Sequence, residues 1–149
     1  MSMTGTTGFH ARWSWRRRLA IAAIGLGLFV PLWVACLLIP DPSGRGTHRQ
    51  LGLPPCTIVV LFGKPCPTCG MTTSWAHAVR GQLFRALRAN VGGALLAVFD
   101  LAAIPWLWIS AWRGRWVGWT PGGTAGAWIS GGLLAVTLVD WIVRLCSAP

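Results

Sequence analysis

The chain has 149 residues, of which 54% are hydrophobic and only 11% are charged, and its formal net charge is +10. Soluble globular domains are about a quarter charged, so this composition excludes an ordinary soluble protein. The basic residues sit at the ends of apolar segments, where they meet lipid phosphates, and the chain has no RNA- or DNA-reading motif. We therefore expect a lipid bilayer as the main partner and no nucleic acid.

The first predicted element is a membrane span. Residues 1–18 form a basic tail that ends in an arginine triplet, and residues 19–39 are continuously apolar. At 1.5 Å per residue this run covers about 30 Å, the thickness of the hydrocarbon core. A signal peptide is the alternative, but its apolar region is roughly 7–15 residues long. We therefore predict an uncleaved transmembrane helix over residues 19–39.

A long connection with two apolar parts follows. Residues 56–62 are apolar but too short to span, which indicates an interfacial or re-entrant segment. After it, apolar residues recur every four positions with arginines between them, and Gly81 interrupts the pattern. This predicts an amphipathic helix, broken at Gly81, that lies in the membrane interface or packs on the spans. The cysteine loop and this helix together cover residues 56–90.

Two further spans complete the predicted fold. Residues 91–112 and 125–145 are long apolar runs, joined by a short loop rich in arginine and tryptophan. Small residues spaced by four on the third run let helices approach closely, which predicts packing within the chain or, alternatively, a homo-oligomer. We expect an all-α membrane protein with three transmembrane helices in one domain over residues 19–149.

Three spans place all five cysteines on one membrane face, since that face receives the end of the first span, the long connection and the end of the third span. The arginine triplet beside the first span and the basic short loop favour an N-terminus on the inside. We therefore expect the cysteine face on the outside of a cytoplasmic membrane.

The spans carry two acidic residues. Asp140 has Arg144 four residues on, which predicts an ion pair. Asp100 has no cation near it in sequence. It is expected to face the protein interior, in a structural or functional role.

The most informative candidate site is the loop sequence Cys66-Pro67-Thr68-Cys69-Gly70. As a metal site, Cys66 and Cys69 give two of the four ligands of zinc, with Cys56, His77 and His48 as candidates for the others. As a redox site, Cys66 and Cys69 exchange disulfides with Asp100 as proton partner. As an architectural turn, the prolines and Gly70 restrict and shape the backbone. The residues alone leave all three open.

The segment from Leu61 to Asn90 resembles a domain-of-unknown-function family of small bacterial membrane proteins. That family has a Cys-Pro-x-Cys-Gly-x-Thr-Arg signature, followed by a glycine and an Ala-Leu-x-x-Asn-Pro-like stretch. Cys66, Pro67, Cys69, Gly70 and Thr72 match the first part, and Gly81, Ala86, Leu87 and Asn90 match the second. Thr73 replaces the usual Arg, and Val91 replaces a frequent Pro. The resemblance implies a bacterial membrane location and no particular activity.

We expect an accessory or interaction protein, not an enzyme, whose cysteine loop shapes a surface at the membrane face. This surface would contact a membrane protein partner or a second copy of the chain. The alternatives are a membrane thiol–disulfide redox protein and a small zinc-binding module.

Overall fold

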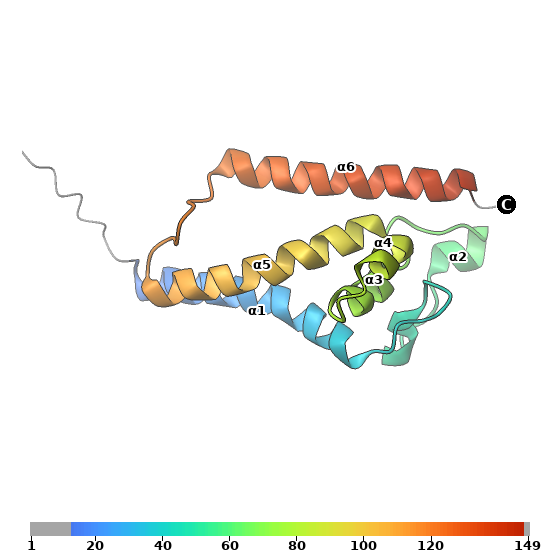
Figure 1. Ribbon diagram of the computed structural model, residues 1–149, viewed down its shortest axis with the longest axis horizontal. Helices are drawn as coiled ribbons and strands as arrows, with labels where there is room; N and C mark the ends of the chain where they lie inside the picture. Colours follow the sequence, from blue (N-terminus) through green and yellow to red (C-terminus); the bar gives the residue numbers. More distant parts are fainter. Residues whose placement is uncertain (1–12, 148–149) are drawn as a thin grey trace, which may run out of the picture.

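The computed structural model describes residues 13–147, which fold into helices and contain no strand. Three of the helices are long and apolar enough to cross a membrane, and four short elements lie between the first and second of them (Figure 1). The elements are α1 (Trp15–Leu37), η1 (Thr47–Leu51), α2 (Thr57–Phe62), α3 (Met71–Ala78), α4 (Leu83–Ala89), α5 (Val91–Arg113) and α6 (Gly123–Ser147).

The predicted fold class is confirmed, with small differences at the ends of the spans. α1 begins four residues before the predicted span, because the Ser14 hydroxyl accepts the Arg17 N–H and caps the helix at Trp15. Residues 1–12 of the predicted basic tail lie outside the described residues. α5 and α6 agree with their predicted ranges to within two residues at each end.

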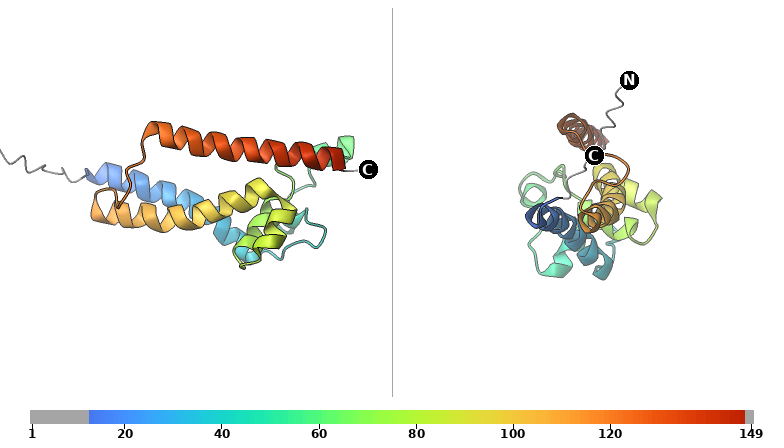
Figure 2. Two further views of the ribbon diagram at one scale, coloured as in Figure 1. Left: turned by 45° about the horizontal axis from the view of Figure 1, so that its top comes forward. Right: turned by 90° about the vertical axis from the view of Figure 1, so that its left-hand side faces the viewer.

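α1 and α5 pack side by side along most of their length (Figures 1 and 2). Gly25 permits the contact, because a Cβ there would lie 2.5 Å from Nε1 of Trp108. Where α5 ends, Arg18 donates to the carbonyls of Ala111 and Trp112 at 2.7 and 2.6 Å. These contacts fix the two helices as one antiparallel pair.

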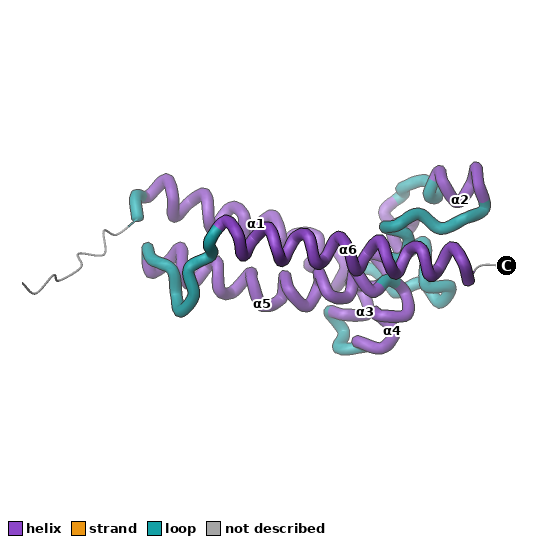
Figure 3. Tube along the Cα trace, turned by 90° about the horizontal axis from the view of Figure 1, so that it is seen from above, coloured by secondary structure: helices purple, strands orange, loops and turns teal. Residues whose placement is uncertain are grey.

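α6 lies over the pair formed by α1 and α5 (Figure 3), and its first half stands apart from these helices (Figure 1). Its contact with α5 is close at Gly92, where a Cβ would collide with Thr137. A Cβ at Gly123, Gly126 or Gly131 would meet nothing within 4 Å. The small-residue stripe predicted to pack within the chain therefore makes no such contact in the described residues.

The predicted amphipathic segment forms two short helices that pack on the spans. Gly81 separates α3 from α4 with a φ of 72°, in agreement with the predicted break. Trp75 on α3 packs against the cluster formed by Leu32 of α1 and Ala97 of α5. The predicted packing on the spans is therefore observed for α3, and it is compatible with the predicted interfacial placement.

The end of α1, the elements from η1 to α4 and the end of α6 gather at one end of the molecule (Figures 1 and 2). All five cysteines lie in these segments, as the three-span topology predicts. α2 also lies here and exposes an apolar surface, with Val60, Leu61 and Phe62 each at least 64% exposed. A helix of this kind is suited to contact lipid at the membrane face.

Candidate functional site

The cysteine loop is a tight turn whose backbone is closed by hydrogen bonds at both ends. The Cys69 N–H donates to the Cys66 carbonyl at 3.1 Å, and the Met71 N–H donates to the Thr68 carbonyl at 3.1 Å. Gly70 then enters α3 with a φ of 87°, a left-handed conformation that favours glycine. A Cβ at Gly70 would lie 2.5 Å from the Ala89 carbonyl oxygen, so the position also has no room for a side chain.

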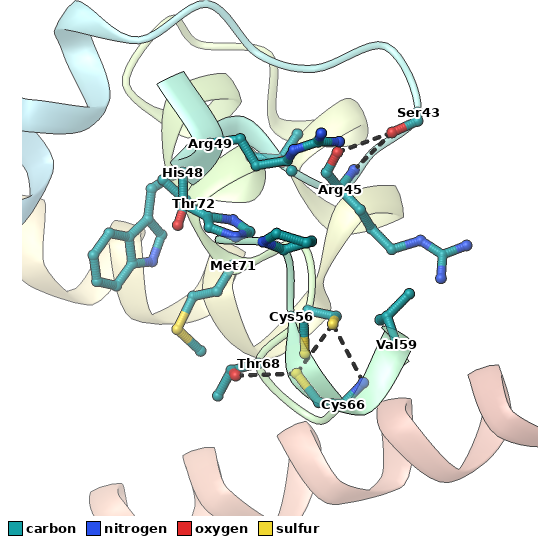
Figure 4. A pocket seen from close by; sticks show the side chains of 16 residues that line it. Ser43, Arg45, His48, Arg49, Cys56, Val59, Cys66, Thr68, Met71 and Thr72 are labelled. Atoms are coloured by element: carbon teal, nitrogen blue, oxygen red, sulfur yellow. Dashed lines mark hydrogen bonds between the residues drawn. The ribbon is translucent and has the colours of Figure 1, made fainter. Parts of the chain in front are cut away.

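Three thiols converge in this loop. The Sγ atoms of Cys56, Cys66 and Cys69 all lie within 4.8 Å of one another, and Cys66 and Cys69 are both buried. Figure 4 shows the Cys66 sulfur beside Thr68, whose Oγ1 is 3.3 Å away. The Cys66 and Cys69 sulfurs are 3.0 Å apart, and the Cys66 N–H donates to the Cys69 sulfur at 3.3 Å. The turn brings together Cys66 and Cys69, and the start of α2 adds Cys56.

Asn90 fastens the loop to the start of α5. Its side chain is fully buried, and Nδ2 donates to the carbonyls of Pro67 and Cys69 at 3.1 and 3.2 Å. Its Oδ1 accepts the Gly93 N–H at 2.7 Å, which caps α5. The side-chain amide of Asn90 therefore holds the cysteine turn and also caps the first turn of α5.

The end of α6 fastens the same turn from the other side. Arg144 donates to the carbonyl of Cys69 at 2.9 Å, and the Trp141 Nε1–H donates to the carbonyl of Pro65 at 2.8 Å. The predicted ion pair is also present, with 2.8 Å between Arg144 Nη2 and Asp140 Oδ2. Arg144 therefore links an acid within α6 to the backbone of the cysteine loop.

The surroundings make the two loop thiols chemically different. Burial raises the pKa of the Cys66 thiol, but hydrogen bonds with Thr68 and the two neighbouring cysteines outweigh it and lower the pKa to about 7. Burial and the hydrogen bond with Cys66 raise the pKa of Cys69 to about 12. Near neutral pH the pair can therefore hold one thiolate on Cys66, with Cys69 protonated beside it.

A cavity of about 690 Å³ opens beside the three cysteines. Its walls come from the loop and η1, the start of α2, and the turn leading into α3. In Figure 4 the cysteines border one side of this cavity, and Arg45 and Arg49 border the opposite side. His48, Met71 and Trp75 also line it.

The other predicted site residues lie apart from the three thiols. His77 Nδ1 is 2.7 Å from Gln82 Oε1, and its side chain lines a second cavity with Arg85 and Arg88. His48 lines the cysteine cavity, and its Nε2 is 3.3 Å from the Pro54 carbonyl oxygen. Asp100 is buried within α5. Cys36 and Cys146 are exposed and free.

Asp100 has no cation as partner among the described residues. Its Oδ1 is buried without a hydrogen-bond partner in this part of the chain, and so is Nε1 of Trp75. Arg80 donates instead to the carbonyls of Ala35, Cys36 and Leu38 at the end of α1. Arg80 therefore acts as a helix cap that joins α3 to α1.

The comparison with family models gives a match in the region that contains this site. Residues 56–104 match the family model of DUF2752, a protein of unknown function. The DUF2752 match runs from Cys56 through the cysteine turn, α3 and α4 into α5, which is 49 of the 149 residues. It confirms the resemblance to a family of unknown function. The searches of curated proteins and of solved structures gave no match.

The DUF2752 match contains the three clustered thiols and Asn90, but α6 lies outside it. Thr73, at the position where the resemblance leads us to expect Arg, is fully buried, and its hydroxyl is 2.8 Å from that of Thr47. The sequence analysis missed the loop contacts of Asn90, Trp141 and Arg144. An asparagine directly before a predicted span is a capping signal, but its second role, as donor to the loop, leaves no local signal.

Proposed function

We propose that this integral membrane protein holds a metal ion of the zinc class at one membrane face through Cys56, Cys66 and Cys69. The observation that carries the proposal is the convergence of three thiols, from two segments of the chain, within 4.8 Å. A lone Cys-x-x-Cys pair supplies two sulfur ligands, and Cys56 raises the number to three of the four that structural zinc needs.

The geometry lies close to that of a zinc–thiolate site. A zinc–sulfur bond is about 2.3 Å long, so two sulfurs on a tetrahedral ion lie about 3.8 Å apart. The Cys66 and Cys69 sulfurs, at 3.0 Å, would separate by about 0.8 Å, which side-chain rotation beside the cavity allows. The loop backbone is already held by Asn90 and Arg144, so the ligands are largely preorganised.

The fourth ligand is His48 or a solvent molecule. His48 lines the same cavity as the three thiols, whereas His77 is hydrogen-bonded to Gln82 and lines the other cavity. The His48→Ala variant is expected to bind zinc roughly 10- to 100-fold more weakly if His48 is the ligand. The His77→Ala variant is expected to bind zinc like the unmodified chain, which tests the predicted His77 ligand directly.

The proposed role is accessory and not catalytic. A metal bound by these thiols would tie the start of α2 to the turn before α3 and fix the position of α2, whose apolar side chains are exposed. The resulting surface at the membrane face would then contact a membrane protein partner. We also propose that the N-terminus lies inside, which the arginines before α1 and in the short α5–α6 loop support.

The experiment is elemental analysis of the full-length chain, purified in detergent with a reductant. We expect about one zinc per chain, lost in the Cys56→Ser, Cys66→Ser and Cys69→Ser variants. Cys36→Ser and Cys146→Ser are matched controls, since both cysteines are free, exposed and outside the cluster. Zinc retained in all three cluster variants would contradict the proposal.

The 3.0 Å separation of the Cys66 and Cys69 sulfurs favours thiol–disulfide exchange as a second candidate function. The Cys66 thiolate would attack a disulfide of a partner protein, forming a mixed disulfide and releasing one partner thiolate. Cys69 would give its proton to the released partner thiolate and attack the Cys66 sulfur. This releases the second partner thiolate, which takes a proton from water, and leaves a Cys66–Cys69 disulfide. Two electrons pass to the partner disulfide, which becomes a dithiol.

Thiol trapping separates the two functions. A reversible Cys66–Cys69 disulfide in chain that contains no metal would support exchange and contradict the metal centre. Metal-bound chain whose thiols resist a mild oxidant until a chelator is added would support the metal centre.

A further inference from the structure

The side of the cavity opposite the cysteines is cationic. Arg45 and Arg49 line this side, and among the described residues no acidic residue lines the cavity. Both arginines are exposed, and among the described residues neither guanidinium has a hydrogen bond or an ion pair. A guanidinium left without a protein acceptor at a cavity is available to bind a carboxylate or a phosphate.

The nearest acid does not neutralise this side. Hydrogen bonds from Ser43 and, more weakly, the charge of Arg49 lower the pKa of Asp41. The Asp41 Oδ1 atom already accepts the N–H and the hydroxyl of Ser43, at 2.8 and 2.6 Å. Asp41 is therefore ionised and offsets at most one of the two arginine charges, so a net positive charge remains at the cavity.

Two other arginines at the same end of the molecule serve the fold. Arg80 donates to carbonyls at the end of α1, and Arg144 donates to carbonyls of the cysteine loop. Arg85 donates to Gln82 at 3.4 Å and, with Arg88, borders the second cavity. Arg45 and Arg49 differ from these residues in lining the larger cavity with uncommitted guanidinium groups.

Part of the remaining wall of the cavity is apolar and lies at the end of the molecule where the spans terminate. Val59, Met71 and Trp75 contribute to this wall. The adjacent α2 exposes Val60, Leu61 and Phe62 at the end of the molecule where the spans terminate. A free anion would use only the arginines, whereas a lipid also places its glycerol and first chain carbons against the apolar wall.

We propose that this cavity binds the phosphate headgroup of an anionic membrane lipid, with Arg45 and Arg49 as the phosphate-binding residues. The cavity volume of about 690 Å³ lies within the range of small-molecule sites and accommodates a glycerophosphate group. The proposal uses the side of the cavity away from the thiols, so it does not depend on a metal being bound there.

The test measures lipid binding to the full-length chain in detergent by native mass spectrometry and by thermal stabilisation. The probes are phosphatidylglycerol, zwitterionic phosphatidylcholine and inorganic phosphate. We expect phosphatidylglycerol to bind and to raise the unfolding temperature, and the other two to have at most a small effect. Arg45→Gln with Arg49→Gln should weaken phosphatidylglycerol binding at least about tenfold, since two charge-assisted hydrogen bonds are lost.

The matched control is Arg85→Gln with Arg88→Gln, which removes the same charge at the same end of the molecule but from the other cavity. It should bind phosphatidylglycerol like the unmodified chain. Equal loss in both double variants, or equal binding of phosphatidylcholine, would overturn the proposal. Stabilisation by inorganic phosphate as strong as that by the lipid would also overturn it. Zinc content in the arginine variants should be unchanged, so failure here is distinct from failure of the metal centre.

Discussion

The side-chain amide of Asn90 donates to the backbone carbonyl of Cys69 at 3.2 Å, across 21 residues of chain. The same Nδ2 donates to Pro67, and the Asn90 carbonyl accepts the Ser74 hydroxyl at 3.0 Å. The cysteine turn, α3 and the start of α5 are therefore joined at one buried residue. Any chemistry of the thiols depends on a loop whose position is set by the second span.

The Asn90→Ala variant is expected to destabilise the fold and loosen the cysteine turn. The carbonyls of Pro67 and Cys69 each lose one of two donors, because Arg144 also donates to them, and the Gly93 N–H loses its acceptor, a combined cost of about 2–4 kcal/mol. Thermal unfolding in detergent measures the change. Gln50→Ala is the control, because Gln50 also bonds a backbone segment, at Ile39, but from an exposed position. Equal shifts in the two variants would contradict the role given to Asn90.

The Gly70→Ala variant tests how closely two backbone carbonyls, of Ala89 and Gly44, approach Gly70 in the turn. Its Cβ would lie 2.5 Å from the Ala89 carbonyl oxygen and 2.8 Å from that of Gly44, in addition to the strain of a positive φ. We expect a loss of more than about 2 kcal/mol, since the strain alone costs about 1–2 kcal/mol. Gly63→Ala isolates the strain, because Gly63 has a φ of 66° and open space around it. If Gly70→Ala loses no more stability than Gly63→Ala, the close contact of Gly70 with the two carbonyls is unimportant for stability.

The pH dependence of alkylation tests the environment of Cys66 in metal-free chain. The thiolate is the reactive form, so the rate with iodoacetamide rises with pH and reaches half its maximum at the pKa. For Cys66 this midpoint is expected near pH 7, and Cys69, with a pKa of about 12, should react slowly throughout. Peptide mass spectrometry assigns the labelled cysteine.

The Thr68→Ala variant should move the Cys66 midpoint upward, toward the ordinary thiol value of 9.0, because a hydrogen bond that favours the thiolate is lost. A midpoint at or above pH 9 in the unmodified chain would contradict the environment described for Cys66.

Labelling of intact cells tests the orientation. With the N-terminus inside, the exposed thiols of Cys36 and Cys146 lie near the external face of the cytoplasmic membrane. A membrane-impermeant maleimide should therefore label single-cysteine versions of the chain at either position without permeabilisation. Labelling that appears only after permeabilisation would place the cysteine face inside.

The parts of the fold that follow from local pattern were predictable from the sequence. Apolar length alone predicts three spans, and Gly81 alone predicts the break between α3 and α4, because both depend on neighbouring residues. The ion pair of Asp140 with Arg144 also follows from spacing on one helix. Cys56 was a predicted ligand candidate, and it lies in the cluster.

The remaining features depend on contacts between distant segments. Arg144 reaches the Cys69 carbonyl across 75 residues, and Trp141 reaches Pro65 across 76, so neither contact has a local signal. The cavity bordered by Arg45 and Arg49 likewise exists only once η1 lies beside the cysteine turn. The sequence pattern shows only that Arg45 and Arg49 are basic loop residues, and it does not indicate that they line the same cavity.

The most direct test of the metal centre is the zinc content of the Cys56→Ser variant, compared with Cys36→Ser and the unmodified chain. Cys56 lies outside the Cys-x-x-Cys pair and enters the site only through the fold, so its contribution separates a three-thiol centre from the pair alone. We expect about one zinc per chain in the unmodified protein and in Cys36→Ser, and a large loss in Cys56→Ser. Equal zinc in all three, or no zinc in any, would contradict it.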